Sequence, residues 1–100
     1  MTTLAINSDT LLIENGKSYP VQVDGNNLYS KDCKVINKCF SFPEKLKFSS
    51  NQNILFSLCY QSEGRPKFAS LKSNKKKVQV CVKDKYVVEL DEMMGQFKKK

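Results

Sequence analysis

The chain has 100 residues, of which 40% are apolar and 27% are charged; four are tyrosine and six phenylalanine, and the formal net charge at pH 7 is +7. This length suits one folded domain and is too short for two, and the aromatic content argues against intrinsic disorder. The longest apolar runs fall far below the ~18 consecutive apolar residues that a membrane helix requires. We therefore expect one globular domain without a membrane partner, and the positive charge suggests a polyanionic partner.

The positive charge is concentrated in the second half of the sequence. Residues 1–50 hold six lysines against five acidic residues, whereas residues 51–100 hold ten lysines and Arg65 against five acidic residues. Almost all the basic residues are lysine, whose flexible point charge suits phosphate contact better than the reading of base edges. A lysine-rich composition can also reflect an AT-rich genome, such as that of a virus or phage, with no function attached.

The first predicted elements are the two strands of a hairpin. Residues 10–14 and 18–24 flank an Asn-Gly pair at 15–16, and both residues of such a pair tolerate the positive φ of a type I′ turn. Pro20 lacks an amide proton, so the second strand lies at an edge or starts only at Val21.

The middle of the chain shows weaker strand patterns. A turn at residues 24–27 precedes short strands at 28–30 and 34–42, the second of which carries apolar residues at both odd and even positions. Pro43 ends this run, and residues 46–48 predict a further short strand.

The best-defined pattern lies at residues 53–61, with the sequence NILFSLCYQ. Apolar side chains occupy every even position from 54 to 60, and two of the odd positions are apolar as well. This pattern is typical of a largely buried central strand. A turn around Gly64 follows it.

Three further strands form a meander. Residues 67–72 return antiparallel, residues 78–83 place three valines on one face, and residues 86–90 follow after a short turn at 84–85.

The C-terminal segment predicts at most one short helical turn, from Asp91 to Gly95. The nearby apolar side chains of Met93, Met94 and Phe97 either form an exposed docking patch or cap the apolar face of the sheet.

These elements together predict an all-β fold, or a β-rich α+β fold. We expect a small antiparallel sheet of about six to eight short strands, curled into a barrel or a sandwich. Residues 1–97 form this single small β domain, and residues 98–100 form a solvated basic tail.

Four cysteines fit a framework of two disulfides by number alone, at positions Cys33, Cys39, Cys59 and Cys81. The N-terminus lacks the pattern of a secretory signal, and the reducing cytosol keeps thiols free. We therefore expect an intracellular protein, cytoplasmic or nuclear, whose cysteines are small buried apolar residues. Because the sequence has no C-x-x-C pair and no histidine, we expect no zinc site and no cofactor.

Catalysis is not expected from this sequence. Without histidine, a Cys-His or Ser-His nucleophile cannot form within one chain, and four scattered glycines cannot build a phosphate-cradling loop. One cluster of acidic residues lies near several lysines, which favours surface ion pairs over a metal site; it consists of Asp84, Glu89, Asp91 and Glu92.

Lysine and aromatic side chains recur together in and around the predicted meander, and the lysines line both of its rims. Proteins that hold single strands combine a basic groove with exposed rings on which bases stack. We therefore expect binding of single-stranded DNA or RNA with weak sequence preference. The candidate phosphate contacts are Lys75, Lys76, Lys77, Lys67, Arg65, Lys72, Lys83 and Lys85, and the candidate stacking residues are Tyr60, Phe68 and Tyr86.

Two alternatives stay open. The aromatic residues can be core or cross-strand partners, while the lysines protect sheet edges against aggregation. The domain can also act as a protein-interaction or inhibitor module that docks an exposed edge strand onto a partner, or forms a homodimer through such an edge. Salt distinguishes these functions, because phosphate binding weakens steeply with added salt and edge docking does not.

Overall fold

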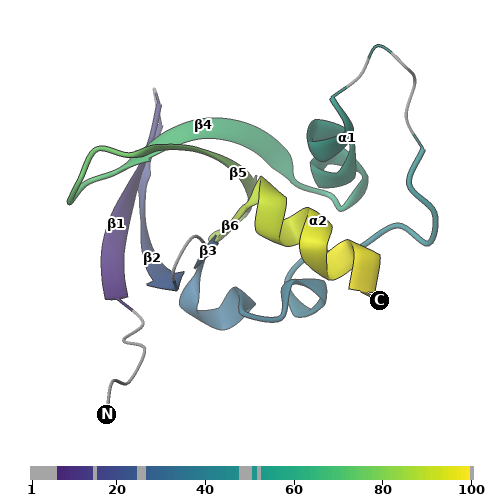
Figure 1. Cartoon of the computed structure of the whole chain (residues 1–100), viewed down its shortest axis with the longest axis horizontal. Helices are drawn as coiled ribbons and strands as arrows, with labels where there is room; N and C mark the ends of the chain where they lie inside the picture. Colours follow the sequence, from purple (N-terminus) through teal and green to yellow (C-terminus); the bar gives the residue numbers. More distant parts are fainter. Residues whose placement is uncertain (1–6, 15, 25–26, 48–50, 52, 100) are drawn as a thin grey trace.

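Six antiparallel strands close into a barrel in the order β1-β2-β3-β6-β5-β4 in the computed structural model, which describes residues 7–14, 16–24, 27–47, 51 and 53–99 (Figure 1). The strands are β1 (Asn7–Ile13), β2 (Ser18–Asp24), β3 (Asn27–Tyr29), β4 (Arg65–Leu71), β5 (Lys77–Lys83) and β6 (Tyr86–Glu89). Four helical segments accompany them: the short turns η1 (Lys31–Cys33) and η2 (Ile36–Lys38), and the helices α1 (Ile54–Gln61) and α2 (Leu90–Lys99). The predicted β-rich barrel is confirmed. None of the described helices is both long and apolar enough to cross a membrane.

The hairpin and the meander form as predicted. β1 pairs with β2 along its length, and Gly16 donates its backbone N–H to Ile13 across the turn at 3.0 Å. Strand β2 begins at Ser18, and Pro20 lies in the part of β2 that pairs with β1 alone, which fits the predicted edge position. Asn15, Gly25 and Asn26 of the predicted turns lie outside the described residues.

Two apolar clusters occupy the two faces of the barrel wall. The inner cluster takes residues from all six strands, which places it inside the barrel; it comprises Leu11, Ile13, Val21, Leu28, Ala69, Leu71, Val80 and Val87. Val78 and Val82 pack against this cluster, which confirms that the three valines of β5 share one face. The outer cluster joins Tyr29, Cys81 and Val88 of the strands to buried residues of the helical segments.

Residues 54–61 form helix α1, and the predicted central strand is wrong. The side chain of Asn53 accepts hydrogen bonds from the N–H groups of Leu55 and Phe56, at 2.9 and 3.3 Å, and so caps the helix. Because apolar residues occupy both even and odd positions of this run, it fits a helical period as well as an alternating one. The helix buries Leu58 and Cys59 completely.

Residues 34–42 do not form the predicted strand either. The short turns η1 and η2 occupy residues 31–38 instead, and they bury Cys33 and Ile36 against the outer cluster. Tight turns of this kind explain why apolar residues fall at both odd and even positions. No strand forms at residues 46 and 47, and Phe48, the last residue of that predicted strand, lies outside the described residues.

The C-terminal helix is longer than the single predicted turn. α2 runs from Leu90 to Lys99 and therefore includes two lysines of the predicted tail. It buries Met93 and Met94, so an exposed docking patch at these residues is wrong and the alternative, packing on the apolar face, is confirmed. Figure 1 shows α1 and α2 on the same side of the barrel.

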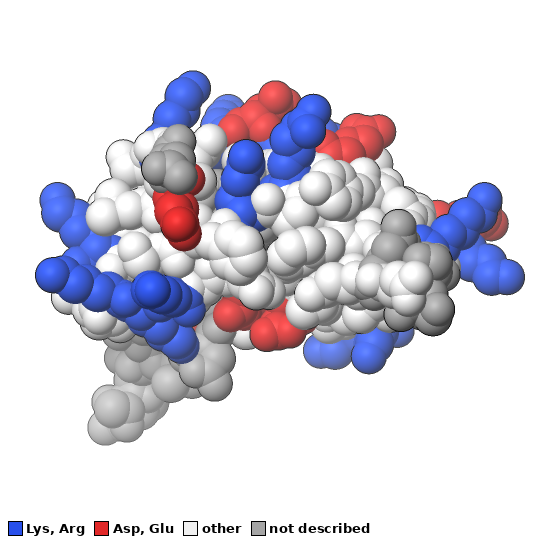
Figure 2. Space-filling model, turned by 90° about the horizontal axis from the view of Figure 1, so that it is seen from above, with Lys and Arg blue, Asp and Glu red and all other residues white. Residues whose placement is uncertain are grey.

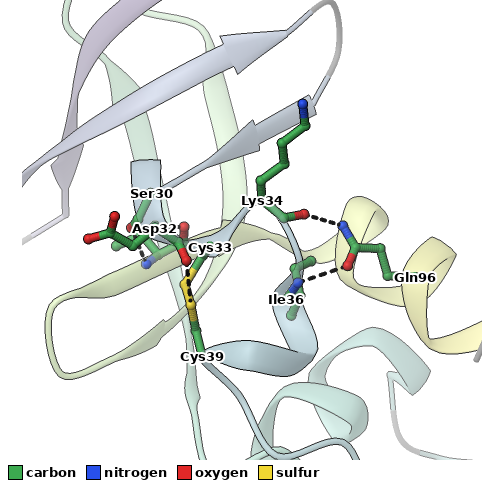
Figure 3. The surroundings of a disulfide bond; sticks show 8 residues. Ser30, Asp32, Cys33, Lys34, Ile36, Cys39 and Gln96 are labelled. Carbon is green, nitrogen blue, oxygen red and sulfur yellow. Dashed lines mark hydrogen bonds between the residues drawn. A yellow bond between two sulfur atoms is a disulfide. The ribbon is translucent and has the colours of Figure 1, made fainter.

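All four cysteines are paired, so the prediction of free thiols is wrong. Cys33 and Cys39 close the loop that holds η1 and η2, and Cys59 of α1 is bonded to Cys81 of β5. Figure 3 shows the loop that the first disulfide closes and Gln96 of α2 beside it; the Gln96 side chain accepts from the N–H of Ile36 and donates to the carbonyl of Lys34, both at 2.8 Å. The prediction of free thiols rested on an expected reducing compartment, which says nothing of geometry, whereas the fold places the Cα atoms of each pair less than 6 Å apart, at 5.8 and 5.6 Å.

At Gly64 the packing leaves no room for a side chain, so the fold requires glycine there. A Cβ atom built there would overlap Cys81 Sγ, and would stand 3.1 Å from the Phe40 ring and 3.2 Å from Cys59 Sγ. Substitution of Gly64 by alanine should therefore lower the free energy of unfolding by about 1–3 kcal/mol through overpacking, measured by urea denaturation.

Gly95 provides the matched control for this prediction. A Cβ atom at this position in α2 meets nothing within 4 Å. Gly95→Ala should raise the free energy of unfolding by about 0.5–1 kcal/mol, because alanine loses less conformational entropy in a helix. Equal effects of the two substitutions would contradict the packing described around Gly64.

Candidate nucleic-acid interface

The structure divides the predicted contact residues among separate places on the surface. The turn between β4 and β5 carries one group, namely Lys72, Lys75, Lys76 and Lys77. Arg65 and Lys83 lie at the opposite end of these strands, as the β4–β5 register requires. Lys67 and Phe68 lie between the two ends, both exposed.

The lysine turn, residues 72–77, is fixed by hydrogen bonds. Lys72 donates its backbone N–H to the carbonyl of Thr10 in β1 at 2.8 Å, and the Ser73 hydroxyl donates to the Asp9 carboxylate. This side-chain hydrogen bond from Ser73, followed by the backbone N–H of Thr10, lowers the pKa of Asp9. Within the turn, the Asn74 side chain accepts from the N–H of Lys76 at 2.9 Å. The lysine turn therefore has a defined shape, attached to β1.

The lysines of this turn differ from Lys83 in their surroundings. Lys83 forms the only salt bridge among the described residues, with its Nζ 2.9 Å from Oε1 of Glu63. The four lysines of the turn are exposed. Figure 2 shows basic side chains gathered at the end of the molecule where Figure 1 places the β4–β5 turn, whereas most of the acidic side chains lie over the middle of this face.

A groove of about 780 Å³ lies beside the lysine turn. Lys76 and Lys77 belong to its wall, as does Phe68, whose side chain is 54% exposed. The rest of the lining comes from β1, α1, β4, β5 and the junction of β6 with α2: Leu12, Ile13, Glu14, Leu55, Ala69, Ser70, Val78, Gln79, Glu89, Leu90 and Asp91. Two basic residues and an exposed ring therefore share one groove with three acidic residues, Glu14, Glu89 and Asp91.

The ring of Phe68 is supported from one side. Phe56 of α1 meets it edge to face, with ring centroids 6.2 Å apart and an interplanar angle of 67°. Such contacts position an aromatic side chain and leave its other surfaces available. Phe68 is therefore an exposed ring in a defined place.

The other two predicted stacking residues do not join this groove. Tyr60 is 60% exposed at the end of α1 and does not line the groove. Tyr86 is partly buried against the outer cluster, and the Lys85 ammonium lies 5.5 Å from the centre of its ring. Lys85 and Tyr86 line a different cavity, of about 360 Å³.

The groove contains residues that the sequence analysis did not select as contacts, above all Leu12 and Glu89. Leu12 is 41% exposed, and Glu89, the last residue of β6, is partly buried. Burial raises the pKa of Glu89, the nearby Asp91 charge raises it further, and Lys76 acts in the opposite direction. Closure of the barrel between β1 and β4 brings Leu12 to the groove, whereas Glu89 reaches it through the pairing of β6 with β5, and neither residue belongs to a lysine-aromatic pattern.

The raised pKa of Glu89 predicts a dependence of stability on pH. The folded state binds the carboxyl proton of Glu89 more tightly than the unfolded state does, so protonation of Glu89 stabilises the fold. This stabilisation is fully present below the ordinary pKa of 4.5 and is lost as the pH rises through the raised pKa. Glu89→Gln should therefore be more stable than the wild type at pH 7, with the difference vanishing at acid pH, as measured by urea denaturation. Glu92→Gln is the control on the neighbouring helix; a less stable Glu89→Gln protein at pH 7 would show that attraction to Lys76 outweighs burial.

Comparison with known proteins gives no match for this chain among the family models, the curated proteins or the solved structures.

Proposed function

We propose that this protein binds single-stranded nucleic acid, without catalysis and with weak overall sequence preference. The observation that carries the proposal is the groove in which the exposed ring of Phe68 lies with Lys76 and Lys77. Charge along a groove holds phosphates, and an aromatic face stacks on a base at about 1–3 kcal/mol per base.

Each part of the surface has a separate role in this proposal. Lys76 and Lys77 hold the phosphates nearest the groove, and Lys72 and Lys75 extend the positive charge around the same turn. The exposed Lys67 and Arg65 continue it along β4. Because lysine contacts phosphates without reading bases, this part of the surface binds any sequence.

Four predicted residues are left out of the binding surface. Lys83 has its charge paired with Glu63, and Lys85 and Tyr86 contact each other beside a different cavity. Tyr60 is exposed, but it does not line the groove.

Two further points concern the cellular compartment of the protein and the alternative function, docking to a protein partner. Two disulfides in one small domain favour an oxidising compartment, which disagrees with the expected intracellular location. Docking by an edge strand, the alternative function, has little edge to use in a closed barrel. Residues 18–21 of β2, which pair with β1 alone, are one segment that such a partner or a second copy would use.

Fluorescence anisotropy with labelled single-stranded and duplex oligonucleotides, at low and at moderate salt, tests the proposed function. We expect tighter binding of the single strand, with an affinity that falls steeply as salt is added. Absence of binding at low salt would reject the proposal, and sedimentation at several protein concentrations would then test self-association through residues 18–21.

A further inference from the structure

Glu89 stands in the groove together with the lysine turn. It is the last residue of β6, and its Cα partner is Val80 of β5, one of the strands that flank the lysine turn. The Glu89 side chain and Lys76 line the same groove, and the positive charge of Lys76 acts on the Glu89 carboxyl group. The groove is therefore not uniformly basic: its lining includes the acidic residues Glu14, Glu89 and Asp91, and Glu89 lies within electrostatic reach of Lys76.

The phosphate and the base of a nucleotide can be matched to the basic and the acidic parts of the groove. A phosphate on Lys76 or Lys77, with its base against the Phe68 ring, leaves the edge of the base for the remaining wall. Part of that wall is formed by Glu89, Leu90 and Asp91, at the junction of β6 and α2. A carboxylate is the polar group that such a base edge would meet there.

We propose that Glu89 makes this groove selective for bases that carry an exocyclic amine, and so for cytosine over thymine; this inference rests on the proposed function. An ionised carboxylate only accepts hydrogen bonds. Cytosine presents an amino group at N4, which can donate to Glu89, whereas thymine presents the carbonyl oxygen O4 at the same position, which repels it. The preference acts on the one base in the groove, and the lysines bind the rest of the strand without regard to sequence.

The test compares oligo(dC), oligo(dT) and an abasic oligonucleotide of equal length by fluorescence anisotropy, for the wild type and for Glu89→Gln. We expect the wild type to bind oligo(dC) at least about fivefold more tightly than oligo(dT). In Glu89→Gln this ratio should fall towards one, and oligo(dT) binding should be unchanged or tighter because a negative charge near Lys76 is removed. Circular dichroism of each variant checks that the fold is retained.

Glu92→Gln is the matched control, because it removes the same charge from the adjacent helix. Glu92 does not line the groove, and its carboxylate accepts from Nε2 of Gln96 at 2.9 Å. This variant should keep the wild-type ratio of dC to dT affinity. Equal wild-type affinities for oligo(dC) and oligo(dT), or a ratio that Glu89→Gln leaves unchanged, would overturn the role of Glu89 while phosphate binding stands. If none of the three oligonucleotides binds at low salt, the proposed function is rejected, and this inference is rejected with it.

Discussion

Replacing Lys75, Lys76 and Lys77 together by glutamine is expected to weaken single-strand binding roughly 10- to 100-fold at low salt and to leave the fold intact. Each phosphate contact contributes about 0.7 to the slope of log affinity against log salt for single strands, so loss of three contacts should reduce that slope by about 2. The hydrogen bonds that shape this turn come from backbone groups and from Asn74, Ser73 and Asp9, all of which the substitutions keep. Anisotropy titrations at several salt concentrations measure both quantities.

A second triple variant separates local contact from net charge. Lys31, Lys34 and Lys38 are also exposed, and they lie on the η1–η2 segment, away from the β4–β5 turn. Their joint replacement by glutamine changes the net charge equally and should alter binding several-fold less. If both triple variants weaken binding to the same extent, the charge of the whole molecule governs binding and the lysine turn has no special role.

Removal of the Cys59–Cys81 disulfide is expected to have the largest effect on stability. The double substitution of both cysteines by alanine should lower the free energy of unfolding by about 3 kcal/mol, because the bond closes a loop with a sequence separation of 22 residues and so restricts the unfolded chain. The same bond joins α1 to the barrel through two completely buried side chains, so its removal also leaves a gap in the outer cluster. Urea denaturation of the variant and the wild type measures the difference.

Substitution of Cys33 and Cys39 by alanine is the comparison for this prediction. The sequence separation of this pair is only 6 residues, which corresponds to a smaller effect of about 2 kcal/mol. Alkylation of the native protein without reductant should add no mass, because no described cysteine is free. Four alkylated thiols, together with an unfolding midpoint that a reductant leaves unchanged, would contradict both disulfides.

The strands that the sequence identifies correctly are those with a local signal. The Asn-Gly turn and the alternating valines of β5 each specify a strand without help from distant residues, and both predictions are confirmed. Residues 53–61 mislead because apolar residues at both even and odd positions fit two periods. The cap at Asn53 was a readable signal for the helix.

The groove is harder to predict than the strands. The lysine turn is visible as a run of like charges, and the register of a simple meander places it correctly at the end of β4. Leu12 enters the same groove from β1 through the β1–β4 pairing, which no local pattern marks, whereas Glu89 comes from the end of β6, whose pairing with β5 belongs to the predicted meander. The pairing of Cys59 with Cys81 also cannot be predicted from a local pattern, because only the packing of α1 against the barrel brings these two residues together.

The closure of the barrel has a consequence for the order in which the protein folds. β1 meets β4 through pairs such as Leu11 with Leu71, and the Asp9 carboxylate reaches Ser73 across a sequence separation of 64 residues. Contacts between residues so far apart slow folding, because the intervening chain must be ordered before they form. An intermediate with the β4–β5 hairpin formed but the barrel still open would carry every lysine of the turn, yet it would lack the β1 wall of the groove. If the proposed function holds, the full affinity for a single strand would be reached during refolding only when the barrel closes.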